Sequence, residues 1–185
     1  MHVRLSTCMG TEVVDRAHGE VIGFLAGIFL HPDTGKVEGV FVRGISGLFA
    51  RAELLFCGSD DILHWGTVLQ IRAASCLAPL VDRIRLSALF AEGRTIVGQR
   101  VETTSGNYMG RCRDIQVDTI KMRLEWLFPR RLLRRETSLP ISEVIEVRSE
   151  AVIVRDPVRP ILASSQEKKE VEPLSFESFP EIAEA

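Results

Sequence analysis

Gly10-Thr-Glu-Val13 and Gly19-Glu-Val-Ile-Gly23 form the pattern that decides the fold of this 185-residue chain. The pattern returns as Gly98-Gln-Arg-Val101 and Gly106-Asn-Tyr-Met-Gly110. From Gly23 onward the two copies match at a constant offset of 87 residues, with small residues opposite small ones and apolar residues opposite apolar ones. Self-similarity over such a period indicates that one structural unit occurs twice. We infer an internal duplication.

The end of each copy matches at a different offset. An offset of 83 places Ser59-Asp-Asp-Ile62 on Ser142-Glu-Val-Ile145, and Val68-Leu-Gln-Ile71 on Ala151-Val-Ile-Val154. The connecting loop of the first copy is therefore predicted to be four residues longer. The shared residues are those that a common fold retains, and no acid, base or nucleophile is repeated among them.

Each copy has the local pattern of short strands. Short apolar runs end at turn residues, and Pro32-Asp-Thr-Gly-Lys36 predicts a turn between strands at 21–31 and 37–43. Five or six strands at a spacing of about 8–12 residues favour a small barrel or sandwich. The sequence therefore predicts a mainly β protein with two small β-barrels in tandem.

Two other segments complete the expected organisation. Leu77, Leu80, Val81, Ile84 and Ala88 have helical spacing, and Gly93 suits a helix end. From Ser164 onward the chain has six Glu and two Lys with isolated apolar residues, a composition typical of disorder. The expected parts are a first barrel at 1–75, a helical linker at 76–93, a second barrel at 94–160 and a disordered acidic tail at 161–185.

Composition excludes several classes of function. The four cysteines form no Cys-x-x-Cys pair and no two histidines have ligand spacing, so neither a metal nor a cofactor is expected. The signature motifs of hydrolases, nucleotide-binding enzymes and metalloproteases are absent, which favours a protein that is not an enzyme. The start of the chain lacks a signal-peptide pattern, and the apolar run Val21–Leu30 is too short to span a bilayer. A cytoplasmic protein without a membrane span is expected.

With the repeat established, each copy resembles a PRC-barrel domain. The resemblance is carried by Gly-x-x-Val, a turn followed by Gly-x-x-x-Gly, an aliphatic strand ending in Asp or His, and a closing segment seen best from Leu139 to Val154. PRC barrels occur in the H subunit of photosynthetic reaction centres and in the C-terminal half of ribosome maturation factors. The resemblance implies a non-catalytic module that binds other macromolecules.

A cluster of arginines is the strongest local charge feature. Arg130, Arg131, Arg134 and Arg135 lie within six residues, and guanidinium groups suit both phosphates and acidic protein surfaces. The alternatives are a solvated hairpin loop and pairing with the protein's own acidic tail. Trp126 could be an interface anchor beside this cluster or could simply fill a barrel. These five residues are the candidate partner-binding site.

Charge is also unevenly distributed along the chain. Residues 1–71 carry a net charge of −3, residues 72–163 carry +5 and the tail carries −4, so the total of −2 is a cancellation. The leading hypothesis is an adaptor that binds protein partners through its barrel faces. The alternative is an RNA- or ribosome-associated factor that uses the Arg130–Arg135 loop. A third hypothesis is homo-oligomerisation through head-to-tail contacts between the oppositely charged halves.

Overall fold

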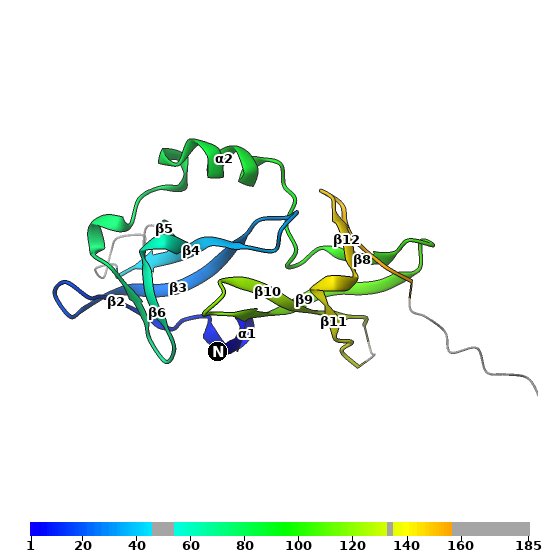
Figure 1. Cartoon of the computed structure of the whole chain (residues 1–185), viewed down its shortest axis with the longest axis horizontal. Coiled ribbons are helices and arrows are strands. Elements are labelled where there is room, and N and C mark those ends of the chain that lie inside the picture. The colour runs from blue at the N-terminus through cyan, green and yellow to red at the C-terminus, as the bar shows by residue number, and fades with distance from the viewer. Residues whose placement is uncertain (46–53, 133–134, 157–185) are drawn as a thin grey trace, which may run out of the picture.

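Thirteen short strands dominate the computed structural model, which describes residues 1–45, 54–132 and 135–156 (Figure 1). The strands are β1 (His2–Arg4), β2 (Glu12–Asp15), β3 (Glu20–Leu30), β4 (Val37–Gly44), β5 (Leu54–Gly58), β6 (Ile62–Trp65), β7 (Leu69–Ile71), β8 (Arg100–Thr103), β9 (Tyr108–Asp118), β10 (Arg123–Arg130), β11 (Leu139–Pro140), β12 (Val144–Val147) and β13 (Ala151–Val154). The two α-helices are α1 (Leu5–Cys8) and α2 (Ile84–Ala91). The mainly β class that the sequence predicts is confirmed, and the predicted disordered tail at 161–185 lies outside the described residues.

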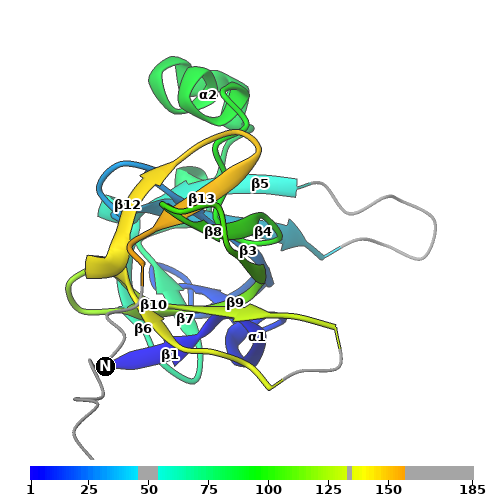
Figure 2. The ribbon, with the colours of Figure 1, turned by 90° about the vertical axis from the view of Figure 1, so that its right-hand side faces the viewer.

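The strands form two curled sheets with the same topology (Figure 2). The first sheet has the order β5-β4-β3-β2-β7-β6, and the second has the order β11-β10-β9-β8-β13-β12. In each sheet the closing strand pairs in parallel with the opening strand, β7 with β2 and β13 with β8. Each sheet is an open half-barrel.

The duplication extends to irregularities in the strands. Glu38 in β4 and Glu125 in β10 are skipped in the pairing with β3 and β9, and they are 87 residues apart. Ala26 and Arg113 are skipped in the same way at the same offset. Because a β-bulge redirects a strand and increases its twist, repeated bulges give both sheets the same curl.

The offset between the ends of the two copies differs in part from the predicted value of 83. The 3₁₀ turns Ser59–Asp61 and Ile141–Glu143, and the strands β6 and β12 that follow them, correspond at an offset of 82 rather than 83. The offset becomes 83 only at β7 and β13, where Leu69 faces Val13 and Val152 faces Val101. Ser59 and Ser142, which the sequence comparison aligned, are therefore not structurally equivalent and are one position out of register. The reason is that the turn before the last strand is one residue longer in the second copy.

Gly23 and Gly110, one equivalent pair of the repeat, are required for steric reasons. A Cβ on Gly23 would lie 2.5 Å from the carbonyl oxygen of Arg43, and a Cβ on Gly110 would lie 2.6 Å from the carbonyl carbon of Arg130. Arg43 and Arg130 are themselves equivalent at the offset of 87. Glycine at these two positions lets the neighbouring strand approach too closely for any side chain to fit.

The two copies meet at the tips of their long hairpins. Val37 donates its N–H to the carbonyl of Met122 (2.8 Å), and Leu124 donates to the carbonyl of Gly35 (2.8 Å). Lys36 forms an isolated bridge with Arg123, its own counterpart. Since equivalent residues bond reciprocally, the two sheets are related by an approximate twofold axis between Lys36 and Arg123.

A single apolar cluster fills the space between the two sheets. Val13, Leu25, Val40 and Ile71 from the first copy belong to the same cluster as residues of the second copy, among them Val101, Ile115, Leu127 and Val152. The structure therefore has two half-barrels with a common core, where the sequence predicted two small barrels in tandem. The physical reason is that neither open sheet can cover its own apolar face.

The N-terminal segment crosses from one copy to the other. β1 precedes the first copy but pairs antiparallel with β9 of the second, with Val3 opposite Val117. α1 then packs on β9, and Cys8 enters the common core. The segment 1–75, expected to form the first barrel, therefore begins with residues that complete the second sheet.

The connection between the copies contains less helix than the sequence suggests. Two 3₁₀ turns precede α2, at Ala74–Cys76 and Leu80–Asp82. α2 ends before Gly93, whose φ is +68°. Pro79 begins a 3₁₀ turn rather than the first turn of a long helix. α2 lies outside the first sheet (Figures 1 and 2), and the ring of Phe90 packs 5.5 Å from that of Phe29. No helix within the described ranges is long and apolar enough to cross a membrane.

Candidate functional site

Five arginines gather at one end of the second sheet, around Tyr108. We call this surface the arginine face and define it by Arg100, Arg111, Arg113, Arg130, Arg131 and Tyr108. Arg100 on β8 lies directly opposite Arg111 on β9, and Arg111 lies opposite Arg130 on β10. Three neighbouring strands therefore present arginine at directly paired positions. Like charges in such positions destabilise a sheet.

Local backbone geometry brings the remaining members together. Gly110 permits close contact with the end of β10, which continues into Arg131 beside Tyr108. Arg113 is the bulged residue of β9 and is exposed together with Arg111. The guanidinium carbons of Arg100 and Arg131 lie 5.2 and 5.7 Å from the ring centroid of Tyr108, within the range of cation–π attraction.

The positive charge of this face is only partly neutralised by the protein itself. Arg100 pairs with Glu102, and Arg111 donates to the carbonyl of Gly98 at 3.1 Å. In the part of the chain that the structure describes, no carboxylate lies within 4.0 Å of a guanidinium nitrogen of Arg113, Arg130 or Arg131. The face therefore offers hydrogen-bond donors in a geometry that suits carboxylates or phosphates.

A solvent-open hollow of about 560 Å³ lies between these side chains. Tyr108, Arg111 and Leu132 contribute to its lining, and Leu132 is almost fully exposed. Enclosed apolar walls, which small-molecule sites commonly have, are not a feature of this hollow. Its shape is better suited to an extended or flat anionic partner than to a small ligand.

The first copy provides an internal comparison. The positions of Arg100, Arg111 and Arg130 are held there by Glu12, Phe24 and Arg43, which also face one another across three strands. The first copy folds into the same half-barrel with this different set. The arginine row is therefore not needed to build the sheet.

The predicted binding residues do not all lie together. Arg130 and Arg131 belong to the arginine face, and Arg135 is exposed beyond it. Arg134 lies outside the described residues. Trp126 is 37% exposed on β10, opposite Pro140 of β11, and does not line the arginine hollow. Its role as an interface anchor stays a prediction.

Sequence reasoning missed Arg100, Arg111, Arg113 and the role of Tyr108. Arg111 and Arg113 alternate around Cys112, which indicates a shared exposed face, but this signal does not say what the face lies beside. Only the pairing of β8, β9 and β10 assembles the row. The run Arg130–Arg135 was conspicuous because its members are adjacent in sequence.

Buried carboxylates elsewhere serve the fold. Asp114 accepts hydrogen bonds from the N–H of Ser6 (3.0 Å) and from its hydroxyl (2.6 Å), which fixes α1 on β9. Asp15 accepts the N–H groups of Ala17 (2.6 Å) and Ala74 (3.1 Å), and its hydrogen bond with His18 lowers its pKa. Because their oxygens are engaged by the backbone, these groups are poorly suited to general acid–base chemistry.

Burial also makes three of the four thiols unreactive. It raises the pKa of Cys8 to about 11 and the pKa values of Cys57 and Cys112 to about 12. A thiol with such a pKa holds its proton at neutral pH and is a poor nucleophile or metal ligand. Cys76 is partly exposed.

Among the residues that the structure describes, one group has potential metal-ligand atoms close together. His2, Asp118 and Glu125 place one such atom each within 4.8 Å of one another. The Nδ1 of His2 lies 2.6 Å from Glu125, and Asp118 accepts the N–H groups of Ile120 (2.9 Å) and Lys121 (3.2 Å). These partners already account for the close approach of the three side chains.

Comparisons with known proteins add no assignment to this geometry. A scan against models of protein families finds no match to the chain, and a search of curated proteins finds none either.

Proposed function

We propose that this chain is a non-catalytic adaptor of the tandem PRC-barrel type, which binds an acidic segment of a partner protein on its arginine face. The observation that carries the proposal is the row formed by Arg100, Arg111 and Arg130. Its like charges lie opposite one another at a cost to the sheet, and the first copy shows that the fold does not require them. A partner that supplies carboxylates would remove this repulsion.

The resemblance to PRC barrels supports the same class of function. The repeated glycine pattern, the two half-barrels of identical strand order and the absence of catalytic motifs are in keeping with a binding module. Fold alone does not specify a partner, so the chemistry of the arginine face supplies the choice.

Affinity purification of the tagged full-length chain from its native cells tests this proposal. The wild type is expected to retain a stoichiometric protein partner, and added salt should weaken retention because surface charges are screened. The variant Arg111→Ala/Arg113→Ala/Arg130→Ala should lose the partner. The matched control Arg16→Ala/Arg43→Ala/Arg85→Ala removes three arginines elsewhere and should keep it. Equal retention by both variants, or no partner for the folded wild type, would overturn the proposal.

Tyr108 favours RNA as a second candidate partner. Its ring is 39% exposed between two guanidinium groups, an arrangement in which an unpaired base can stack while phosphates contact the arginines. RNA binding predicts co-sedimentation with ribosomal particles that weakens steeply with salt. It further predicts that Tyr108→Ala weakens binding of a single-stranded oligonucleotide about tenfold and Tyr108→Phe much less, since one stacked base contributes about 1–3 kcal/mol. An equal effect of both substitutions would contradict stacking.

A further inference from the structure

The approximate twofold symmetry fails at one strand edge. β1 pairs with β9 at Gln116, Val117 and Asp118. At the offset of 87 these residues correspond to Phe29, Leu30 and His31 of β3. Among the described residues, no strand pairs with this edge of β3. The first sheet therefore lacks the strand that completes the second.

The missing strand has a clear structural cause. Before Gly23 the two copies are aligned by the equivalence of Gly10 and Gly98, so the residues equivalent to His2–Arg4 are 90–92. These residues form the end of α2 and its cap. The two copies become equivalent again by Gly10 and Gly98, which donate to the carbonyls of Leu25 (2.8 Å) and Cys112 (2.7 Å). The segment before Gly98 therefore joins the first sheet only after the position that a strand equivalent to β1 would occupy.

The backbone of Leu30 is oriented to accept a strand there. His31 donates its N–H to the carbonyl of Lys36 across the hairpin at 2.8 Å. Because successive residues of a strand direct their polar groups to opposite edges, the N–H and C=O of Leu30 point away from β4. In the second copy the equivalent groups of Val117 face Val3 of β1. Pro32 stands where Thr119 donates to Met1, so β3 offers one donor fewer than β9.

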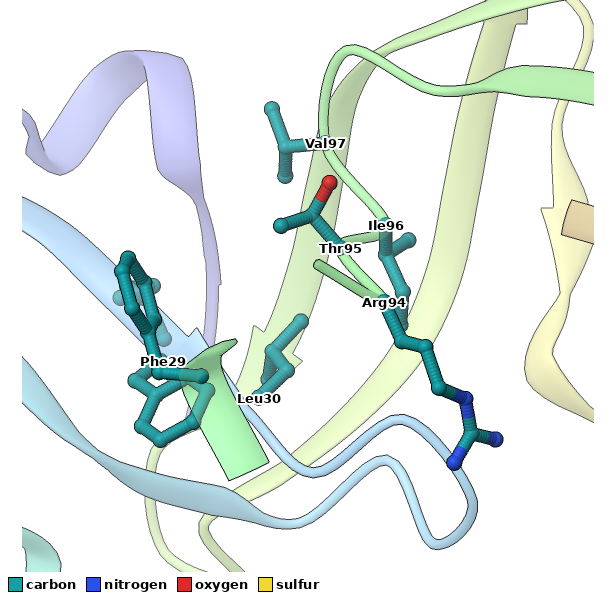
Figure 3. Close-up of a pocket in the computed structure, with 8 residues that line it drawn as sticks. Phe29, Leu30, Arg94, Thr95, Ile96 and Val97 are labelled. Carbon is teal, nitrogen blue, oxygen red and sulfur yellow. The ribbon is translucent and has the colours of Figure 1, made fainter. Parts of the chain in front are cut away.

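A hollow of about 200 Å³ lies beside this edge (Figure 3). We call it the β3 groove; its lining residues are Ile28, Phe29, Leu30, Phe90 and Arg94–Val97. Figure 3 shows Phe29 and Leu30 on one side and Thr95, Ile96 and Val97 on the other. The ring of Phe90, 46% exposed, extends the apolar surface of Phe29.

The charge at the rim distinguishes this groove from the arginine face. Arg94 is paired with Asp33 and Glu92, and its Nε donates to the carbonyl of Val147 at 2.7 Å. The one cation in the lining is therefore neutralised. An aliphatic segment fits the groove better than an acidic one.

We propose that the β3 groove binds an extended segment of a partner protein that carries an aliphatic residue at its centre. The segment runs antiparallel to β3 and places that residue opposite Leu30, as Val3 lies opposite Val117. The protein's own second copy thus supplies the direction, the register and the central side chain. Adding a strand to an exposed sheet edge is an established mode of peptide recognition. This site is separate from the arginine face and does not depend on its function.

A peptide copy of β1 is the most direct probe. A synthetic peptide of residues 1–9 carrying Cys8→Ser is added in excess to the intact isotope-labelled protein, whose β9 site is already filled by its own β1. Amide shifts are expected at Phe29–His31 and Thr95–Val97, and hydrogen exchange of the Leu30 amide should slow at least tenfold. The same peptide N-methylated at Val3 has lost the donor that faces Leu30 and should produce no such changes.

Two protein variants sharpen the result. Val97→Trp places a large side chain in the groove and should abolish the shifts, whereas Val81→Trp, the same change at an exposed valine outside the groove, should leave them. Absence of shifts at millimolar peptide, equal binding of the N-methylated peptide, or shifts confined to Gln116–Asp118 would each overturn the proposal. The same holds if Leu30 is already protected in the free protein, through residues 157–185 or, at rising protein concentration, through a second copy.

Discussion

Individual glycines determine how closely the strands approach in each copy. Gly110 has a φ of +127° and lies against the backbone of Arg130 and Arg131, and Gly23 lies against Arg43. Gly27, by contrast, has only ordinary contact with the side chain of Phe41, the nearest atom being 3.5 Å from the position of a Cβ. Gly23 and Gly110 are thus steric requirements, and Gly27 is not.

This difference gives a matched pair of substitutions. Gly110→Ala is expected to destabilise the protein by about 2 kcal/mol or more, since it combines backbone strain with overlap against a strand backbone that cannot move away. Gly27→Ala should change stability by less than about 1 kcal/mol. Urea unfolding of both variants measures the difference, and similar midpoints would contradict the steric account.

Two carboxylates stabilise turns by accepting several hydrogen bonds each. Asp118 accepts the N–H groups of Ile120 and Lys121, and these bonds lower its pKa to about 2. Asp156 accepts hydrogen bonds from Thr104 and Ser105, mainly from their side chains, which lower its pKa to about 2. Both groups favour the folded protein when they are ionised.

The sign of the pH dependence follows from these shifts. A carboxylate with a depressed folded-state pKa contributes stability that is complete above its unfolded value, near 4, and is lost as the pH falls toward 2. The free energy of unfolding should therefore decline between pH 4 and pH 2. Asp118→Asn and Asp156→Asn should each lower stability at pH 7 and flatten this decline. If the free energy of unfolding has the same pH dependence in Asp118→Asn as in the wild type, the hydrogen bonds to Asp118 do not stabilise the fold as described.

At the level of secondary structure, β1 is the element that distinguishes the two sheets. It is three residues long, yet it covers the edge of β9 and places Arg4 3.7 Å from the ring centroid of Phe128. Its hydrogen-bonding register aligns Val3 with Val117. Nothing in the local sequence Met1-His-Val-Arg indicates that its partner lies more than a hundred residues away.

Val3→Pro tests the role of this strand. Proline removes the N–H that pairs with β9, and the expected loss of stability is about 1–3 kcal/mol. Hydrogen exchange should accelerate at Val117 and Thr119, whereas Leu30 and its neighbours in β3 should be unaffected. Uniform acceleration across both sheets would show instead that β1 contributes only to global stability.

At the scale of the whole molecule, the two copies form one folding unit. The apolar cluster includes residues of both sheets, equivalent hairpins bond reciprocally, and β1 crosses between the copies. Because each half-barrel is open, its apolar face depends on the other copy for cover. We therefore expect a single cooperative transition rather than independent unfolding of two domains.

The two tryptophans provide one probe for each copy. Trp65 lies in β6 of the first sheet and Trp126 in β10 of the second. Urea unfolding followed by fluorescence in Trp126→Phe reports on the first copy, and in Trp65→Phe on the second. Each variant should show one transition in which fluorescence and circular dichroism coincide. Fluorescence that changes before the circular dichroism is complete would indicate that one copy unfolds alone.

The sequence alone determined much of the element pattern. The glycine spacing revealed the duplication, and alternating apolar residues with turn residues predicted the hairpins at 21–43 because these signals are local. Helical spacing over 76–93 overstated the helix, since 3₁₀ turns occupy part of that segment. The run Arg130–Arg135 was visible because its members are consecutive.

Only the tertiary structure decided how these parts combine. The arginine face requires the pairing of β8, β9 and β10, and the common core requires two open sheets to cover each other. Within the described residues, no strand covers the edge of β3 that corresponds to the edge covered by β1 on β9, because residues 90–92 form the end of α2 and its cap. Each of these features depends on contacts between residues distant in sequence, which local propensity does not encode, whereas each strand and turn depends on its immediate neighbours.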